Sequence, residues 1–306
     1  MKKLLILVSV LALLCAGCSD APAQEDDTLH ILATTYPVYL FTTAVTEGVE
    51  GIEVSRLITE EVSCLHDYTL TVSDMKAIER ADIIVMNGAG FENFMSDALA
   101  QTDAAVIDCS AGIRLLETCH SHDEHDHEGH GHEHDPHIWL DPVLANQMMA
   151  TISTELSKSL YCDDLASHGE FHTAYLTAAQ TLEMARQRWN TQLQPTTEWN
   201  LITFHDGFQY FADAFDLELL KSIEEEEGST ASAADIKEIV ALIREYNIPA
   251  IFTEKNGSDT TARAIARETG VEIYQLDMLM SGDGQDISSY FDAVNANYAI
   301  IQEALS

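Results

Sequence analysis

The chain has 306 residues, of which 46% are hydrophobic, and a formal net charge of −36 at pH 7. A chain of this length can bury one large core or two smaller ones, and we expect two lobes. The strong negative charge excludes nucleic acid and anionic lipid surfaces as electrostatic partners, and it favours attraction of cations.

Residues 1–18, MKKLLILVSVLALLCAGC, have the pattern of a secretory leader. Two lysines precede an apolar run that is too short for a membrane-spanning helix, and small residues then lead to a cysteine. The Ala16-Gly17-Cys18 ending resembles the lipobox of bacterial lipoproteins, although Cys15 stands where that box usually carries leucine. We therefore predict a signal peptide over residues 1–17, lipidation of Cys18 and a polar linker over residues 18–27. The body would be extracytoplasmic and held by the lipid anchor alone at the outer face of the bacterial cytoplasmic membrane.

Short β-rich runs alternate with helical stretches through the first half of the body. The expected strands are His30–Thr35, Val54–Ile58, Ile83–Asn87 and Ala105–Asp108, and the expected helices are Pro37–Glu47, Ser73–Arg80 and Phe91–Ala100. This alternation predicts βα units on a mostly parallel sheet. Asp141-Pro142 then has the pattern of an N-cap followed by proline at the first helical position, and this helix should end near Leu160.

Histidine is concentrated in one segment, where eight of the thirteen histidines lie between His120 and His137. Neutral imidazole is a ligand for Zn²⁺, Cu²⁺ and Ni²⁺, and a merely solvated acidic loop does not need so many imidazoles. The tract 120–134 is interpreted as a loop of interchangeable, low-affinity donors: His120, His122, His125, His127, His130, His132 and His134. His137 differs, because an apolar run and the helix start follow it, so we expect it to be a single, well-held ligand.

The stretch from Asp163 to Leu193 has no proline and a recurrent apolar spacing, which predicts one long helix that ends before Pro195. The alternation then resumes. We expect strands at Leu201–Phe204, Leu219–Ile223, Ala250–Thr253 and Val271–Leu276, and helices at Phe208–Phe215, from Ser232 to Tyr246, at Asp259–Thr269 and from Ser289 to Leu305. Ser232–Asp235 is a capping-box pattern. Two comparable α/β halves therefore flank one helix, with domains predicted at 28–160, 161–194 and 195–306.

Four cysteines follow Cys18, at positions 64, 109, 119 and 162. In an extracytoplasmic protein they allow three pairings, among which the sequence does not choose. The pair that we favour is Cys109 with Cys119, because these residues bracket a short loop.

Ligands bind beyond the carboxyl ends of the strands in an open parallel sheet, so donors that follow predicted strands are the candidates. His66 and His137 follow strands of the first half, and His205 and Asp277 follow strands of the second half. Three imidazoles and one carboxylate would form a tetrahedral site suited to Zn²⁺. Asp67 and Glu254 are further carboxylates that could supply the fourth donor.

The order of these motifs resembles the metal-binding lipoproteins of zinc and manganese ABC transporters. The resemblance rests on His66 with the downstream Ser73-Asp74, the NGAGFENF stretch at 87–94, the His-rich loop running into DPHIWLDP, and FHDGFQYFA at 204–212. It implies two (β/α) lobes joined by a rigid helix, with metal held in a cleft between them by His66, His137, His205 and Asp277. It also implies delivery to a membrane permease driven by a cytoplasmic ATPase. Two motifs depart from the family pattern, at 64–70 around His66 and at Asp277-Met278-Leu279.

The sequence therefore predicts a monomeric zinc-binding protein that delivers Zn²⁺ to an ABC importer and catalyses no reaction. The His-rich loop accompanies zinc rather than manganese members of the family that the chain resembles. Three alternatives remain at this point: a manganese-binding importer component, a secreted zinc-dependent hydrolase, and a surface zinc store or adhesin. The hydrolase would need an open coordination position and a general base, and Glu254 is the residue available for that role.

Overall fold

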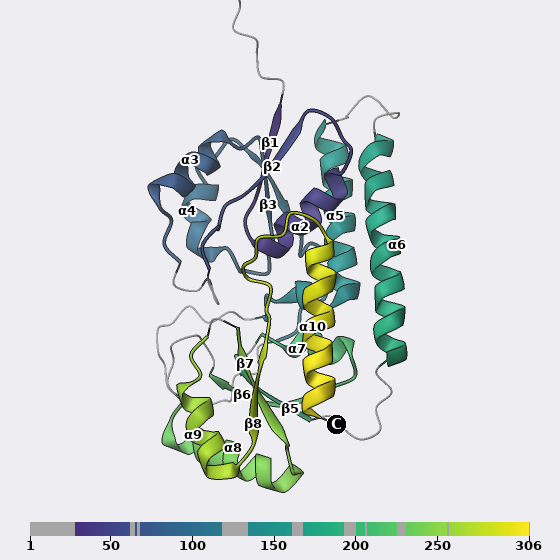
Figure 1. The fold of residues 1–306 in the computed structure, drawn as a ribbon. Helices are drawn as coiled ribbons and strands as arrows, with labels where there is room; N and C mark the ends of the chain where they lie inside the picture. Colours follow the sequence, from purple (N-terminus) through teal and green to yellow (C-terminus); the bar gives the residue numbers. More distant parts are fainter. Residues whose placement is uncertain are drawn as a thin grey trace, which may run out of the picture.

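The computed structural model describes residues 28–61, 65, 68–117, 134–160, 168–192, 200–205, 207–224, 231–255 and 257–305. Within these residues the chain forms two four-stranded sheets, one above the other, each covered by helices (Figure 1). Every strand pair in both sheets is parallel. The α/β class and the two lobes expected from the sequence are confirmed.

The first sheet has the strand order β2-β1-β3-β4. Its strands are β1 (Leu29–Ala33), β2 (Ile52–Arg56), β3 (Ile83–Met86) and β4 (Ala105–Asp108), and its helices are α2 (Tyr36–Thr46), α3 (Val72–Arg80) and α4 (Ser96–Leu99). Ile83, Ile84 and Val85 of β3 are buried, so both faces of this strand are covered, as expected for a central parallel strand. Thr71 and Asp74 form a capping box that begins α3.

The helix expected over residues 91–100 is shorter in the structure. A 3₁₀ turn, η1 (Asn93–Met95), precedes α4, and the three residues Gly88, Ala89 and Gly90 before it all have positive φ angles. Left-handed backbone stops a helix from starting earlier. At Gly88 a side chain would also collide with Asp108, since a Cβ atom there would lie 1.8 Å from Asp108 Oδ1.

The second sheet repeats the arrangement of the first, with the strand order β6-β5-β7-β8. Its strands are β5 (Asn200–His205), β6 (Glu218–Glu224), β7 (Ala250–Glu254) and β8 (Glu272–Leu276), and its helices are α7 (Gln209–Ala214), α8 (Ala233–Tyr246) and α9 (Thr260–Thr269). The predicted capping box of Ser232 and Asp235 begins α8. In each sheet the order in which strands are added changes direction between the two central strands, β1 and β3 or β5 and β7. Open α/β sheets bind ligands at this point.

Helices α6 (His168–Gln192) and α10 (Ser288–Ala304) connect the two halves, and α5 (Pro142–Leu160) packs against α6 and against α2 and β4 of the first half. Helix α6 runs beside both sheets in Figure 1 and packs against α5, α2 and α10. Trp189, near its end, is fully buried, and its indole N–H donates to Asn295 of α10. The long helix predicted from the apolar spacing is therefore present and is fixed at its second end by α10.

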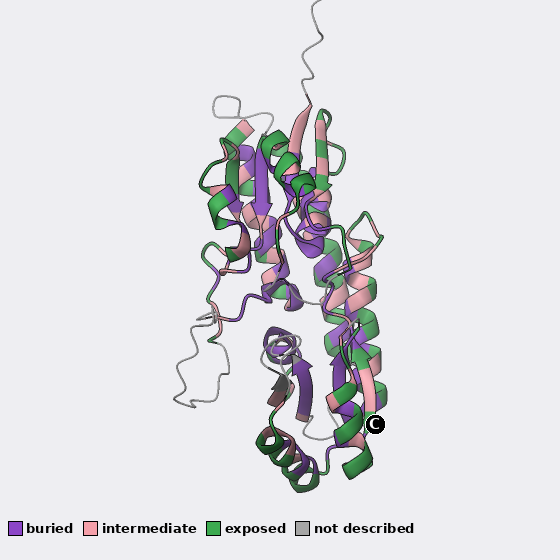
Figure 2. Cartoon of the chain, turned by 90° about the vertical axis from the view of Figure 1, so that its left-hand side faces the viewer, coloured by how far each residue is buried: buried purple, intermediate pink, exposed green. Residues whose placement is uncertain are grey.

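One hydrophobic core extends through both halves of the molecule, and buried residues run from the first sheet through the middle of the structure to the second (Figure 2). A smaller cluster lies between the second sheet and α8 and α9. The connection between β8 and α10, residues 277–287, reaches the first half, where Arg56 donates to the Gly282 carbonyl at 3.0 Å. The halves therefore share a core as well as a linking helix.

Among the described residues, no helix combines the length and the apolar character that crossing a bilayer requires.

Candidate metal centre

Of the four predicted ligands, His205 and Asp277 lie at the carboxyl ends of strands in the structure. His66 comes from the connection after β2 and lies outside the described residues, whereas His205 is the last residue of β5 and only its backbone is described. His137 is described and 3% exposed, and Asp277 is the first residue after β8. Among the residues that the structure describes, no group of three or more His, Cys, Asp or Glu side chains is placed to hold a metal ion.

His137 lies immediately before the 3₁₀ turn η2 (Ile138–Leu140), and a buried carboxylate holds its ring. Its Nδ1 is 2.7 Å from Oδ1 of Asp135, which also accepts the His137 backbone N–H at 2.9 Å. An ionised carboxylate can only accept, so with Asp135 in that form the Nδ1 atom carries the proton. In the neutral ring the Nε2 atom then carries the lone pair with which an imidazole binds a metal.

Aromatic rings surround His137 on two sides. The rings of Phe91 and Trp139 lie with centroids 5.7 Å and 5.2 Å from the His137 ring. Both aromatic residues are almost fully buried. These rings restrict the orientation of the imidazole and keep water from its faces, which strengthens the bond to the Asp135 carboxylate.

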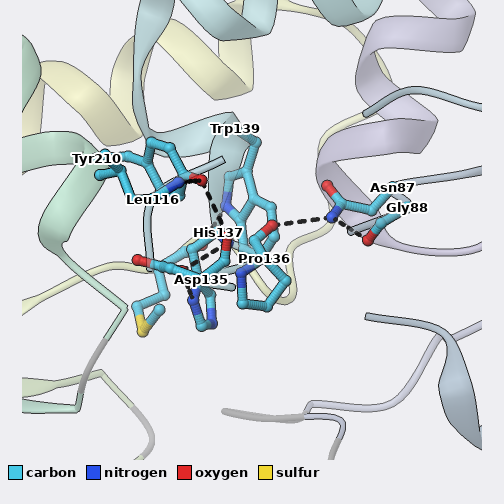
Figure 3. A network of polar contacts seen from close by, with 9 residues as sticks. Asn87, Gly88, Leu116, Asp135, Pro136, His137, Trp139 and Tyr210 are labelled. Atoms are coloured by element: carbon cyan, nitrogen blue, oxygen red, sulfur yellow. Dashed lines mark hydrogen bonds and ion pairs between the residues drawn. The ribbon is translucent and has the colours of Figure 1, made fainter. Parts of the chain in front are cut away.

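The segment 135–140 is hydrogen-bonded to the second half of the chain at three points. Tyr210 of α7 donates to the Asp135 carbonyl at 3.0 Å, and the Trp139 indole donates to the Met278 carbonyl at 2.9 Å. Tyr290 of α10 donates to the Trp139 carbonyl at 2.9 Å. Figure 3 shows the contacts around Asp135 and His137, including the one from Tyr210. Since Met278 is next to Asp277, the segment that carries His137 is fixed beside the segment that carries Asp277.

Asp277 is held at its backbone and at both carboxylate oxygens. Asn297 of α10 accepts its N–H and donates to its carbonyl, each at 2.7 Å. The Leu279 N–H donates to Oδ1 at 2.8 Å, and Lys255 pairs with Oδ2 at 3.2 Å. The lysine is 63% exposed, so this ion pair is weak and a divalent cation can displace it.

Glu254 is the second candidate carboxylate in this half. It is the last residue of β7 and 6% exposed. Thr203 of β5 is in register with Phe252 of β7, so the parallel ladder places His205 level with Glu254 on neighbouring strands. The central position between β5 and β8 puts this carboxylate at the point of the sheet where ligands bind.

A second buried carboxylate supports His137 from the first half. Glu92 is 4% exposed and accepts three hydrogen bonds, from the Thr34 hydroxyl and from the backbone N–H groups of Asn87 and Gly88. Burial raises the pKa of Glu92 to about 7, although these hydrogen bonds act to lower it. The Asn87 side chain donates to the Pro136 carbonyl at 2.9 Å, directly before His137 (Figure 3).

None of the predicted ligand positions includes Asp135, Asn87 or Glu92. The spacing Asp-Pro-His contained a signal for Asp135, because a carboxylate two residues before a histidine can reach its ring. Nothing local indicates that Glu92 is buried, since Thr34, which donates to it, is 58 residues away in the chain.

A described pair of residues flanks the segment that contains the His-rich tract. Glu117 and His134 form an antiparallel bridge, and the Asp135 N–H donates to the Leu116 carbonyl at 2.9 Å. The other six histidines of the tract, His120, His122, His125, His127, His130 and His132, lie outside the described residues, as do Cys18 and Cys119. Cys109 is a fully buried free thiol at the end of β4, so the pairing with Cys119 is not seen in the structure.

Comparison with known proteins places the chain among zinc-uptake components. The family model described as "zinc-uptake complex component A periplasmic" matches residues 31–304. The high-affinity zinc uptake system protein ZnuA of Bacillus subtilis is 29% identical over 98% of this chain and 97% of its own length. The zinc-binding lipoprotein AdcA of Streptococcus pneumoniae is 28% identical over 99% of this chain, which spans only 61% of AdcA.

Solved structures show the same architecture. A crystal structure of ZnuA, 28% identical, covers 91% of this chain and 100% of its own, with a TM-score of 0.75. The periplasmic zinc-binding protein TroA of Treponema pallidum, 25% identical, covers 91% of this chain and 99% of its own, with a TM-score of 0.76.

Proposed function

We propose, from the premise that this chain belongs to the family of periplasmic zinc-uptake components A, that it captures Zn²⁺ outside the cytoplasm and delivers it to an ABC importer. The observation that carries the proposal is the buried Asp135–His137 pair at the carboxyl end of the first sheet. The Nδ1 side of the ring faces Asp135, so Nε2 is the atom that we assign to zinc. The family is named for a component of an uptake complex, so the chain acts as a binding protein and not as an enzyme.

The proposed ligands are His66, His137, His205 and one carboxylate of the second half, either Asp277 or Glu254. Imidazole nitrogens bind Zn²⁺ much more tightly than Mn²⁺, so a site dominated by histidine favours zinc over the manganese alternative. The fold supports the second-half members of the set, since His205, Asp277 and Glu254 lie at or directly after the carboxyl ends of parallel strands. We keep 28–160, 161–194 and 195–306 as the proposed bounds of the two lobes and the linking helix.

The proposed partners are a membrane permease and its cytoplasmic ATPase, with the chain acting as a monomer. A lipid on Cys18 would hold it at the outer face of the cytoplasmic membrane, in agreement with the description of the AdcA relative as a lipoprotein. The net charge of −36 raises the concentration of cations near the protein and so accelerates zinc capture.

Zinc titration of single variants tests the ligand set. We expect His66→Ala, His137→Ala and His205→Ala each to abolish tight binding of the first zinc equivalent, because three imidazoles are needed to complete the site. Asp277→Ala and Glu254→Ala separate the two carboxylates, and the larger loss of affinity identifies the fourth ligand. Undiminished first-equivalent affinity in a histidine variant would remove that residue from the site.

An assay for zinc-dependent hydrolysis, run on the same zinc-loaded protein, tests the competing class. We expect no hydrolysis above the background of free zinc. Tight binding without hydrolysis supports a carrier, whereas hydrolysis that Glu254→Ala abolishes would favour the hydrolase.

A further inference from the structure

We propose that Asp135 is a positioning residue for zinc binding, which fixes His137 as an Nε2 ligand without touching the metal itself. This inference rests on the proposed function and extends it, because it assigns a role to a residue that no ligand pattern includes. It also gives the reason why His137 differs from the histidines of the adjacent tract.

The geometry of the pair carries the proposal. Asp135 is fully buried, and its Oδ1 accepts both the ring Nδ1–H and the backbone N–H of His137, at 2.7 Å and 2.9 Å. Its Oδ2 has no hydrogen-bond partner among the residues that the structure describes. Within the described residues, this carboxylate therefore makes its hydrogen bonds to His137.

A buried carboxylate in this position selects one tautomer of the imidazole. It disfavours the tautomer with the proton on Nε2, which has no lone pair on that atom and so cannot bind a metal through it. A neutral imidazole without such a partner exchanges between its two tautomers, so only part of its population presents an Nε2 lone pair.

The backbone around Asp135 is fixed from both halves of the molecule, which keeps the carboxylate in place. Tyr210 of α7 donates to the Asp135 carbonyl, and the Asp135 N–H donates to the Leu116 carbonyl. Asn87 donates to the carbonyl of Pro136, the residue between the pair. The imidazole is thus oriented before any metal arrives, and less ordering entropy is lost on binding.

The neighbouring Asp141-Pro142 dipeptide provides a matched control. Asp141 is the next aspartate before a proline in the same segment, but its carboxylate accepts the Val143 N–H at 2.6 Å and begins α5. Asparagine caps helices as well as aspartate does, so Asp141→Asn should leave both the fold and zinc binding unchanged.

Asp135→Asn is the test, because asparagine has the same shape without the charge. Its amide can either accept from Nδ1–H or donate to Nδ1, so both tautomers of His137 become accessible. We expect Asp135→Asn to lose first-site zinc affinity by roughly 10- to 100-fold. Competition with a chromophoric chelator measures this affinity, and Asp141→Asn should keep the wild-type value. The Co²⁺ spectrum of Asp135→Asn should also lose intensity. If the unfolding temperature of the zinc-free variant equals that of the wild type, a purely structural role for Asp135 does not explain this loss.

Nitrogen-15 imidazole spectra of the zinc-free wild-type protein provide a readout that needs no variant to fold. We expect the His137 proton on Nδ1, and a proton on Nε2 would overturn the proposal. Wild-type affinity in Asp135→Asn, or an equal loss in Asp141→Asn, would also overturn it. Failure of the proposed function is recognised separately, since the wild-type protein would then bind no zinc tightly.

Discussion

At the scale of single residues, the burial of Glu92 makes the stability of the zinc-free protein depend on pH. Desolvation is the main reason why its pKa is raised from the ordinary value of 4.5 to about 7 in the folded protein. The folded state therefore binds a proton more tightly than the unfolded state does. The contribution of Glu92 to the stability of the folded state is therefore greatest below about pH 4.5. This contribution falls as the pH rises from about 4.5 to about 7.

We predict that Glu92→Gln removes this dependence. Relative to the wild type, the variant should gain on the order of 3 kcal/mol of unfolding free energy between pH 5 and pH 8, since each unit of pKa shift corresponds to about 1.4 kcal/mol. Urea unfolding with a chelator present measures the difference. Glu79→Gln, at an exposed position on α3, serves as the control and should show no such change. A difference between Glu92→Gln and the wild type that stays constant with pH would contradict the prediction.

At the scale of the elements, the connection 277–287 holds the two halves together by close packing. Gly282 lies against Tyr36 at the start of α2, and a Cβ atom at this position would be 2.5 Å from the nearest ring carbon. Arg56 lies over the same ring at 4.8 Å and donates to the Gly282 carbonyl. A side chain at this position must therefore displace either the ring or the connection.

We predict that Gly282→Ala destabilises the protein by about 1–3 kcal/mol, as other overpacking substitutions do. Gly169→Ala is the matched control, because it lies in the first turn of α6 and, among the described residues outside its own stretch of helix, no atom lies within 4 Å of an added Cβ. Alanine is the better helix former, so this variant should be neutral or slightly more stable. Thermal unfolding of both variants measures the contrast, and equal stabilities would show that the connection accommodates the extra atom freely.

At the scale of the whole molecule, the His-rich tract and the buried pair predict two classes of zinc sites. Deleting residues 120–132 leaves the Glu117–His134 bridge and the Asp135–His137 pair in place. We predict that the deletion keeps one tight zinc equivalent and removes the weaker ones, because the rest of the site is held without the tract. Zinc stoichiometry and first-site affinity are the measurements, with growth under a chelator as the cellular readout. Loss of the tight equivalent would place part of the tract among the primary ligands.

The sequence by itself determined the class of fold and most of the secondary structure, the helix expected over residues 91–100 being the exception. Apolar periodicity and caps act over a few residues, so Ser232–Asp235 and Asp141-Pro142 mark the same helix starts in the sequence and in the structure. Alternating strands and helices implied parallel sheets because such connections leave few other arrangements. The site residues His66, His137, His205 and Asp277 came from strand ends and from a family resemblance, and they stay predictions until zinc binding is measured.

Only the tertiary structure decided what surrounds these residues. The Trp139–Met278 hydrogen bond joins positions 139 residues apart, and the Arg56–Gly282 bond joins positions 226 apart. The burial of Glu92 and of Asp135 likewise depends on segments from elsewhere in the chain. A side chain's hydration and pKa are set by all the groups packed around it, and the sequence near a residue specifies only a few of those groups.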